Sequence, residues 1–263
     1  MPFFKINNHA YSPYRGGISS ERIDVGSPWG NTANGISFRD NIKSKKKISI
    51  TLKPMALSEV KAMMSFIDKI DCMSFDSTKT SQIGKVVPDS VGTNSLVTSP
   101  KKYGSKSLSL SSGSELSYNI NLSNTYTISL WKHNGTTFDN WVYLSDGTQY
   151  KNGIEHTPST EDIENFLSAT PTSITIFGKS SAGVNSSTNY DDICIYKGHL
   201  SSSIISSIFN STRSMCADKG VCFIETDFID EAADYIAYEE TVEVSDKSPN
   251  HYVAKICCIE VGE

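Results

Sequence analysis

Residues 190–201 read YDDICIYKGHLS, and this stretch says most about the fold of the 263-residue chain. Residues 192–196 contain a short, continuous apolar run, which predicts a strand. A short helix is expected directly afterwards, over 200–209, because Ile204, Ile205 and Ile208 fall at helical spacing. Asp191 and Asp192 are adjacent, so on a strand their side chains are expected to point to opposite faces.

The residues before this stretch form a series of short apolar runs separated by polar turns. Strands are predicted over 103–110, 126–132, 141–144, 149–151 and 173–178. The tetrapeptide SDGT at 145–148 places Asp-Gly between two of these runs, which is a strong hairpin signal. Because strands do not alternate with helices here, the middle of the chain is predicted to be an antiparallel β-sandwich.

The middle of the chain resembles the laminin-G-like, concanavalin-type jelly-roll family. The resemblance rests on an ordered series of motifs: FD at 75–76, DSVG at 89–92, YGSKSL at 103–108, YTISLW at 126–131, YKNG at 150–153 and, the most specific, residues 190–201. It implies a jelly roll over residues 72–210 that serves recognition of glycans or proteins rather than catalysis.

The same resemblance implies candidate ligand-binding residues. Some family members hold Ca²⁺, and the candidate ligands here are Asp76, Asp191 and Asp192. A calcium site needs six to eight oxygen ligands, so the alternative is that Asp191 caps a loop and Asp192 anchors the sandwich. Glycan-binding members present aromatic side chains, each of which could instead belong to the core; the candidates are Tyr103, Phe138, Trp141, Tyr143 and Tyr150.

The flanking segments resemble a different family, the distal-tail and minor-tail proteins of long-tailed bacteriophages. Residues 26–35 form a Gly- and Asn-rich loop, and KKISITLK at 46–53 alternates as a half-buried strand. Ser58 is the expected N-cap of a helix that carries Val60, Met63, Met64 and Ile67 at helical spacing. Strands are also expected over 221–226 and 235–244, and a last strand over 251–261 can pair with the start of the chain.

These observations predict a mainly β protein with a split, β-rich (α+β) assembly domain, formed by residues 1–71 and 211–263, and an inserted antiparallel jelly roll over 72–210. The tail resemblance implies a virion structural protein that is assembled in the host cytoplasm and forms a homo-oligomeric ring with other tail subunits. The insertion would either bind a host cell-surface glycan or decorate the tail. Trp29 either packs under its loop or contacts a neighbouring subunit. The alternatives are a free-standing lectin-like protein and a divergent glycan hydrolase.

Composition argues against several other classes. A net charge of −5 and a pI near 5.6 are unlike a nucleic-acid-binding protein, which usually has a basic face. No apolar run approaches the ~20 residues that span a bilayer, and residues 1–9 do not read as a signal peptide. The six cysteines show no framework spacing, which favours thiols over disulfides and leaves zinc as a weaker alternative. No nucleophile or phosphate-binding motif is present, so neither an enzyme nor a cofactor is expected.

Overall fold

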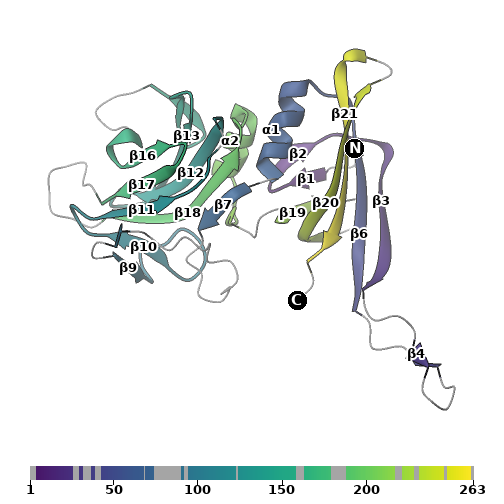
Figure 1. Cartoon of the computed structure of the whole chain (residues 1–263), viewed down its shortest axis with the longest axis horizontal. Helices are drawn as coiled ribbons and strands as arrows, with labels where there is room; N and C mark the ends of the chain where they lie inside the picture. The colour runs from purple at the N-terminus through teal and green to yellow at the C-terminus, as the bar shows by residue number, and fades with distance from the viewer. Residues whose placement is uncertain are drawn as a thin grey trace. The chain divides into compact units, whose positions relative to one another are not determined.

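A computed structural model of the chain describes residues 4–25, 30–31, 37–38, 43–67, 69–73, 90–91, 94–122, 124–157, 163–178, 188–216, 221–227, 231–245 and 248–261. Most of these residues lie in antiparallel strands, which confirms the prediction of a mainly β chain (Figure 1). Within these ranges, no helix has the length and apolar character needed to cross a membrane.

The chain divides into two compact units. The first contains residues 1–6, 10–60 and 221–263, and the second contains residues 7–9 and 61–220. The first unit is thus built from both ends of the chain. Its boundaries differ from the expected positions at 71/72 and 210/211. One physical reason is strand β7 (Lys69–Met73), which pairs antiparallel with β18 (Thr188–Lys197) of the second unit.

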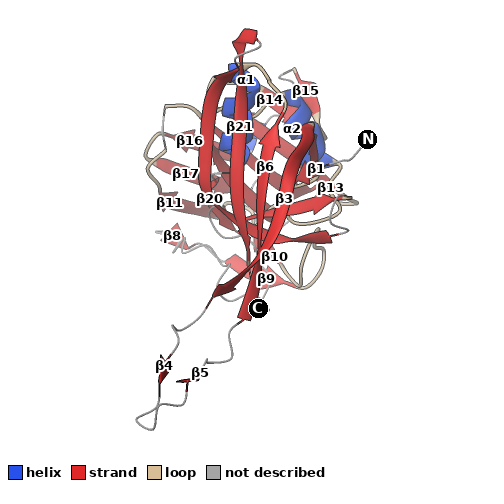
Figure 2. Cartoon of the chain, turned by 90° about the vertical axis from the view of Figure 1, so that its right-hand side faces the viewer, coloured by secondary structure: helices blue, strands red, loops and turns tan. Residues whose placement is uncertain are grey.

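The first unit is organised around a seven-stranded antiparallel sheet in the order β2-β1-β19-β20-β21-β6-β3. Figure 2 shows β20, β21, β6 and β3 running side by side. The strands are β1 (Phe4–Ile6), β2 (His9–Tyr11), β3 (Pro13–Val25), β6 (Lys43–Leu52), β19 (Val221–Thr226), β20 (Glu231–Ser245) and β21 (Ser248–Glu260). The short strands β4 (Gly30–Asn31) and β5 (Ser37–Phe38) pair with each other.

The alternating pattern of the sequence explains how β6 and β21 pair. Ile48 and Ile50 are fully buried, while Ser49 between them bonds its hydroxyl to the Cys257 thiol across the strands at 3.4 Å. In the register, Ile256 lies opposite Ile50 and Cys258 lies opposite Ile48. One face of this pair is therefore apolar and the other polar, and the expected pairing of the last strand with an early one is present.

Helix α1 (Leu57–Ile67) begins one residue before the predicted N-cap. Ser58 lies inside the helix, and the carboxylate of Glu59 accepts the Ala56 N–H at 3.1 Å. A carboxylate in the first turn can satisfy a free N–H and also suits the positive end of the helix dipole. As the spacing predicted, Val60, Met63 and Ile67 are buried, whereas Met64 is only half-buried.

The second unit is a sandwich of two antiparallel sheets. The larger sheet has the order β15-β14-β13-β12-β18-β10-β9, with β7 also on β18, and the smaller has the order β16-β17-β11-β8. The strands are β8 (Ser90–Val91), β9 (Asn94–Val97), β10 (Ser107–Leu110), β11 (Glu115–Asn119), β12 (Tyr126–His133), β13 (Phe138–Leu144), β14 (Gln149–Lys151), β15 (Ile154–His156), β16 (Leu167–Thr170) and β17 (Ser173–Phe177); a 3₁₀ turn, η1, spans Ile163–Asn165.

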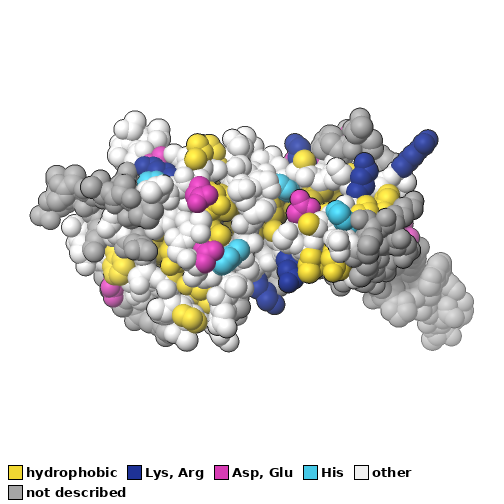
Figure 3. Space-filling view, turned by 90° about the horizontal axis from the view of Figure 1, so that it is seen from above, with side chains coloured by type: hydrophobic (Ala, Val, Ile, Leu, Met, Phe, Trp, Pro, Cys, Tyr) yellow, Lys and Arg dark blue, Asp and Glu magenta, His cyan; other side chains and the backbone are white. Residues whose placement is uncertain are grey.

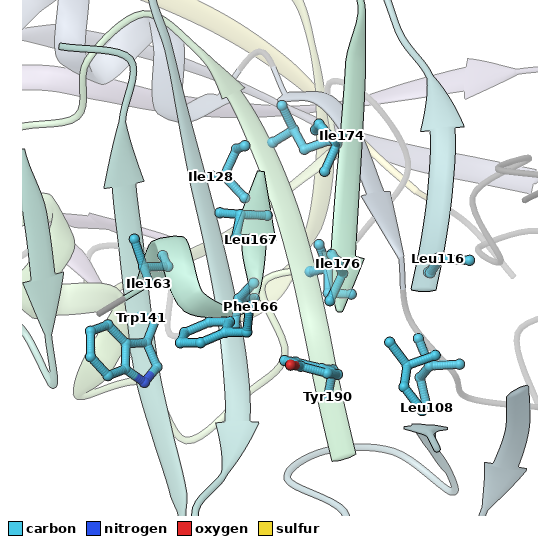
Figure 4. Close-up of a cluster of buried hydrophobic side chains, with 14 of the residues drawn as sticks. Leu108, Leu116, Ile128, Trp141, Ile163, Phe166, Leu167, Ile174, Ile176 and Tyr190 are labelled. Atoms are coloured by element: carbon cyan, nitrogen blue, oxygen red, sulfur yellow. The ribbon is translucent and has the colours of Figure 1, made fainter. Parts of the chain in front are cut away.

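The central strands of the larger sheet are buried on both faces. One face shares a core with the smaller sheet, where Ile128 and Tyr190 meet Ile174 and Ile176 (Figure 4). The other face is covered by helix α2 (Ser202–Phe209), whose Ile204, Ile205 and Ile208 were predicted at helical spacing and are all buried. Ser201 caps this helix by accepting the Ile204 N–H. Double coverage explains why β12 and β18 are buried along almost their whole length.

Candidate functional site

Asp191 and Asp192 lie within β18, where its pairing with β12 shifts register between Ser129 and Trp131. Asp192 has a φ of 47°, in the left-handed region that Asp and Asn tolerate better than most residues. Both side chains are only 2% exposed. The irregular backbone at this point determines which segment each carboxylate faces.

The two carboxylates bind different segments of the second unit. Asp191 Oδ2 accepts the N–H groups of Lys102 at 2.8 Å and Tyr103 at 3.0 Å, and its Oδ1 accepts the Asp192 N–H at 2.8 Å. Asp192 accepts the Met215 N–H at 2.9 Å, the Cys216 N–H at 3.2 Å and the Ser214 hydroxyl. Each carboxylate therefore secures a loop against β18.

This arrangement does not suit calcium. Ca²⁺ requires a shell of oxygen ligands, whereas the atoms facing Asp191 and Asp192 are mainly backbone N–H donors. The third candidate ligand, Asp76, lies outside the described residues. Within the described part of the chain, the Asp pair fits the alternative reading, in which both side chains anchor loops.

Burial affects the protonation of both carboxyl groups. It raises the pKa of Asp191 to about 6, against the opposing effect of the Tyr103 and Lys102 N–H groups. It also raises the pKa of Asp192 to about 6, against the opposing hydrogen bond from Ser214. Desolvation disfavours the charged form of each group, so burial shifts the titration of both carboxyls toward higher pH.

The aromatic candidates are mostly part of the core. Trp141 is fully buried, and its ring meets Phe166 edge-on with 5.4 Å between centroids (Figure 4). Tyr150 is 9% exposed and belongs to the cluster under α2. Tyr143 is half-buried and packs against the inter-sheet core. A fully buried ring cannot stack on a sugar, so Trp141 is not an exposed platform. Trp29 lies outside the described residues.

The two remaining aromatic candidates keep partial exposure. The Tyr103 hydroxyl donates to the Ser211 carbonyl at 2.8 Å, and its ring meets Trp131 edge-on. Phe138 packs edge-on against the His133 ring, with 5.0 Å between centroids. On the face shown in Figure 3, acidic, basic and histidine side chains lie scattered among apolar and polar ones.

The sequence did not predict a Ser–His–Asp arrangement at the β13–β14 turn. Ser145 Oγ lies 2.8 Å from His199 Nε2, and His199 Nδ1 lies 3.4 Å from Asp146 Oδ2. Acyl transfer would also need N–H donors to stabilise an oxyanion. The next two N–H groups with described bonds, those of Gly147 and Thr148, already donate to the Leu144 carbonyl and to Asp146. The arrangement therefore closes a hairpin and ties it to His199, two residues before the cap of α2.

A second unpredicted feature is a buried group formed by Asp192, Cys194 and Cys216. The two cysteines lie in different predicted segments, and no spacing in the sequence relates them. Comparison with known proteins adds no assignment for this or the other sites: no family model, curated protein or solved structure matches the chain.

Proposed function

We propose that the protein is a structural subunit of a phage tail or tail-like particle, in which the first unit assembles and the second unit recognises a surface glycan. The observation that carries the proposal is the open sheet of the first unit. It is built from both ends of the chain, and its edge strand β3 is 13 residues long. A long edge strand presents backbone N–H and C=O groups that can pair with another chain.

The sandwich supports the recognition half of the proposal through its architecture. Its sheets and the α2 helix share two cores, so the loops and strand ends are held on a rigid support. Recognition residues commonly lie on loops positioned by such a scaffold. Repeated copies in an assembly would raise the apparent affinity of a weak glycan site through avidity. No described feature requires catalysis in this scheme.

Proline substitution on β3 tests assembly through the sheet edge. Successive residues of an edge strand direct their N–H groups alternately toward the partner strand and away from it. Ser19 and Ser20 are both exposed and pair with Ser49 and Ile48 of β6. Of the two variants Ser19→Pro and Ser20→Pro, one therefore removes an N–H that bonds to β6 and lowers the melting temperature. The other removes an N–H on the outer edge and leaves the pairing with β6 intact.

The measurement is sedimentation velocity of the full chain over a range of concentrations. We expect the wild-type chain to associate, and the proline variant with an unchanged melting temperature to associate at least about tenfold more weakly, which corresponds to ~1.4 kcal/mol. A wild-type chain that stays monomeric at every concentration would contradict the assembly proposal and favour the free-standing lectin-like alternative.

A glycan array probed with the full chain tests the recognition half. We expect binding to a restricted set of surface polysaccharides, without turnover of the bound glycan. Tyr143 is the aromatic residue chosen for mutation, because it is partly exposed and is held by strand β13 of the sandwich. Tyr143→Ala is expected to weaken binding and Tyr143→Phe to retain most of it. Release of sugar fragments from the array would instead support the hydrolase alternative.

A further inference from the structure

Two cysteines and an aspartate meet in the interior of the second unit. Ligand atoms of Asp192, Cys194 and Cys216 all lie within 4.8 Å of one another, and all three side chains are buried. The two sulfur atoms are 3.5 Å apart. A disulfide bond is about 2.05 Å long, so this separation is that of two thiols or of two ligands of one ion.

An independent observation at the same place is the hydroxyl of Tyr196. Asp192, Cys194 and Tyr196 alternate along β18, and side chains at alternate positions of a strand share a face. Tyr196 is fully buried, and its hydroxyl makes no well-formed hydrogen bond to a described residue, although the Cys194 side chain lies close to it. A buried hydroxyl without a well-formed hydrogen bond is uncommon in a folded protein and indicates that a further atom belongs at this cluster.

We propose that Cys194, Cys216 and Asp192 bind a structural Zn²⁺ ion, with the Tyr196 hydroxyl beside the fourth position. Zinc prefers four ligands in a tetrahedral arrangement, with zinc–sulfur distances of about 2.3 Å. Two sulfur atoms at that distance and angle lie about 3.8 Å apart. The observed 3.5 Å requires only a slight closing of the angle at the metal.

The carboxylate of Asp192 has room for this bond. Its Oδ1 accepts the Ser214 hydroxyl and the Cys216 N–H, whereas the described bond to Oδ2 is the Met215 N–H. A carboxylate oxygen has about two acceptor positions, so Oδ2 keeps one for a cation. Zinc would also place positive charge next to a carboxylate that is otherwise desolvated.

The ion would connect two distant parts of the second unit. Cys194 belongs to β18, and Cys216 follows helix α2 and is 22 positions further along the chain. Binding would deprotonate both thiols and release two protons to solvent, without any redox change. Because the ligands are buried, zinc would enter as the chain folds, and metal binding would add to the stability of the folded state.

The test is to refold the full chain with Zn²⁺ alone, remove the excess by gel filtration, and measure zinc by mass spectrometry. We expect about one equivalent per chain. Co²⁺ in place of Zn²⁺ should give the visible bands of a tetrahedral site and a thiolate-to-cobalt charge-transfer band. The Cys194→Ser variant and the Cys216→Ser variant should each fail to retain the metal ion. Cys257→Ser is the matched control, because this partly exposed thiol lies in the first unit.

Three results would overturn the proposal: a folded, reduced wild-type chain without zinc, an unchanged zinc content in the Cys194→Ser/Cys216→Ser double variant, or a Cys194–Cys216 disulfide in the chain as purified. If a serine variant does not fold, the charge-transfer intensity of the wild-type cobalt form still counts the thiolate ligands. A band intensity that corresponds to two thiolate ligands supports the site, and the absence of the charge-transfer band contradicts it.

Discussion

Replacing Trp141 by alanine is expected to lower the free energy of unfolding by about 3–5 kcal/mol, because removal of a large aromatic side chain leaves a cavity in the core. The ring is fully buried. It meets Phe166 and His156 edge-on, with centroid separations of 5.4 and 5.2 Å, and the Lys151 ammonium lies 5.0 Å from its centroid. Such contacts add to the stabilisation from burial alone.

Urea denaturation measures this effect as a change in the unfolding transition of the second unit. Ile154→Ala is the matched control, since Ile154 is 73% exposed and its loss should change stability by no more than about 0.5 kcal/mol. The result also decides the role of Trp141. If Trp141→Ala left stability unchanged and abolished ligand binding, the ring would be a ligand contact and its assignment to the core would be wrong.

Asp191→Ala is expected to lower the free energy of unfolding by about 3 kcal/mol at about pH 4.5. Three N–H donors lose their acceptor, and each unsatisfied donor costs at least about 1 kcal/mol. Those donors belong to Lys102, Tyr103 and Asp192. The substitution should release the loop at 102–103 from β18. Hydrogen exchange of the Lys102 and Tyr103 amides checks this directly, and unchanged protection there would contradict the role assigned to Asp191.

The cost of Asp191→Ala should also depend on pH. In the chain without bound zinc, burial raises the folded-state pKa of Asp191 to about 6 from an ordinary value of 3.8. The folded chain therefore binds more protons than the unfolded chain between these values, and the contribution of Asp191 to stability is present below about pH 4 and is lost as the pH rises through about 6. The change amounts to roughly 3 kcal/mol. Asp191→Asn has no titrating group here, so its stability relative to wild type should rise from pH 4 to pH 7.

Much of the sandwich could be predicted from local patterns. The Asp-Gly turn at 146–147 joins β13 and β14, and the isoleucines of α2 are buried as their spacing indicates. A period of two or 3.6 residues depends only on neighbours in sequence. The start of α1 shows the limit of such reasoning. Ser58 was the expected N-cap, whereas the Glu59 carboxylate accepts the free Ala56 N–H there.

The candidate site was less predictable, because the burial of a side chain depends on what covers it. Trp141 and Tyr143 both lie on β13, yet one is fully buried and the other half-buried. The local sequence pattern shows both rings, but it does not predict that the central strands of the larger sheet are covered on both faces. That coverage changes an aromatic side chain from a possible contact into part of a core.

The sequence by itself determined that this protein is mainly β, where most of its strands and its helix α2 lie, and that Asp191 and Asp192 would face different surroundings. Only the tertiary structure decided that these surroundings are the segments at 102–103 and 214–216, and that Cys194 and Cys216 meet beside Asp192. The physical reason is range: strand and helix periods arise between near neighbours, whereas a buried cluster requires distant segments to pack together.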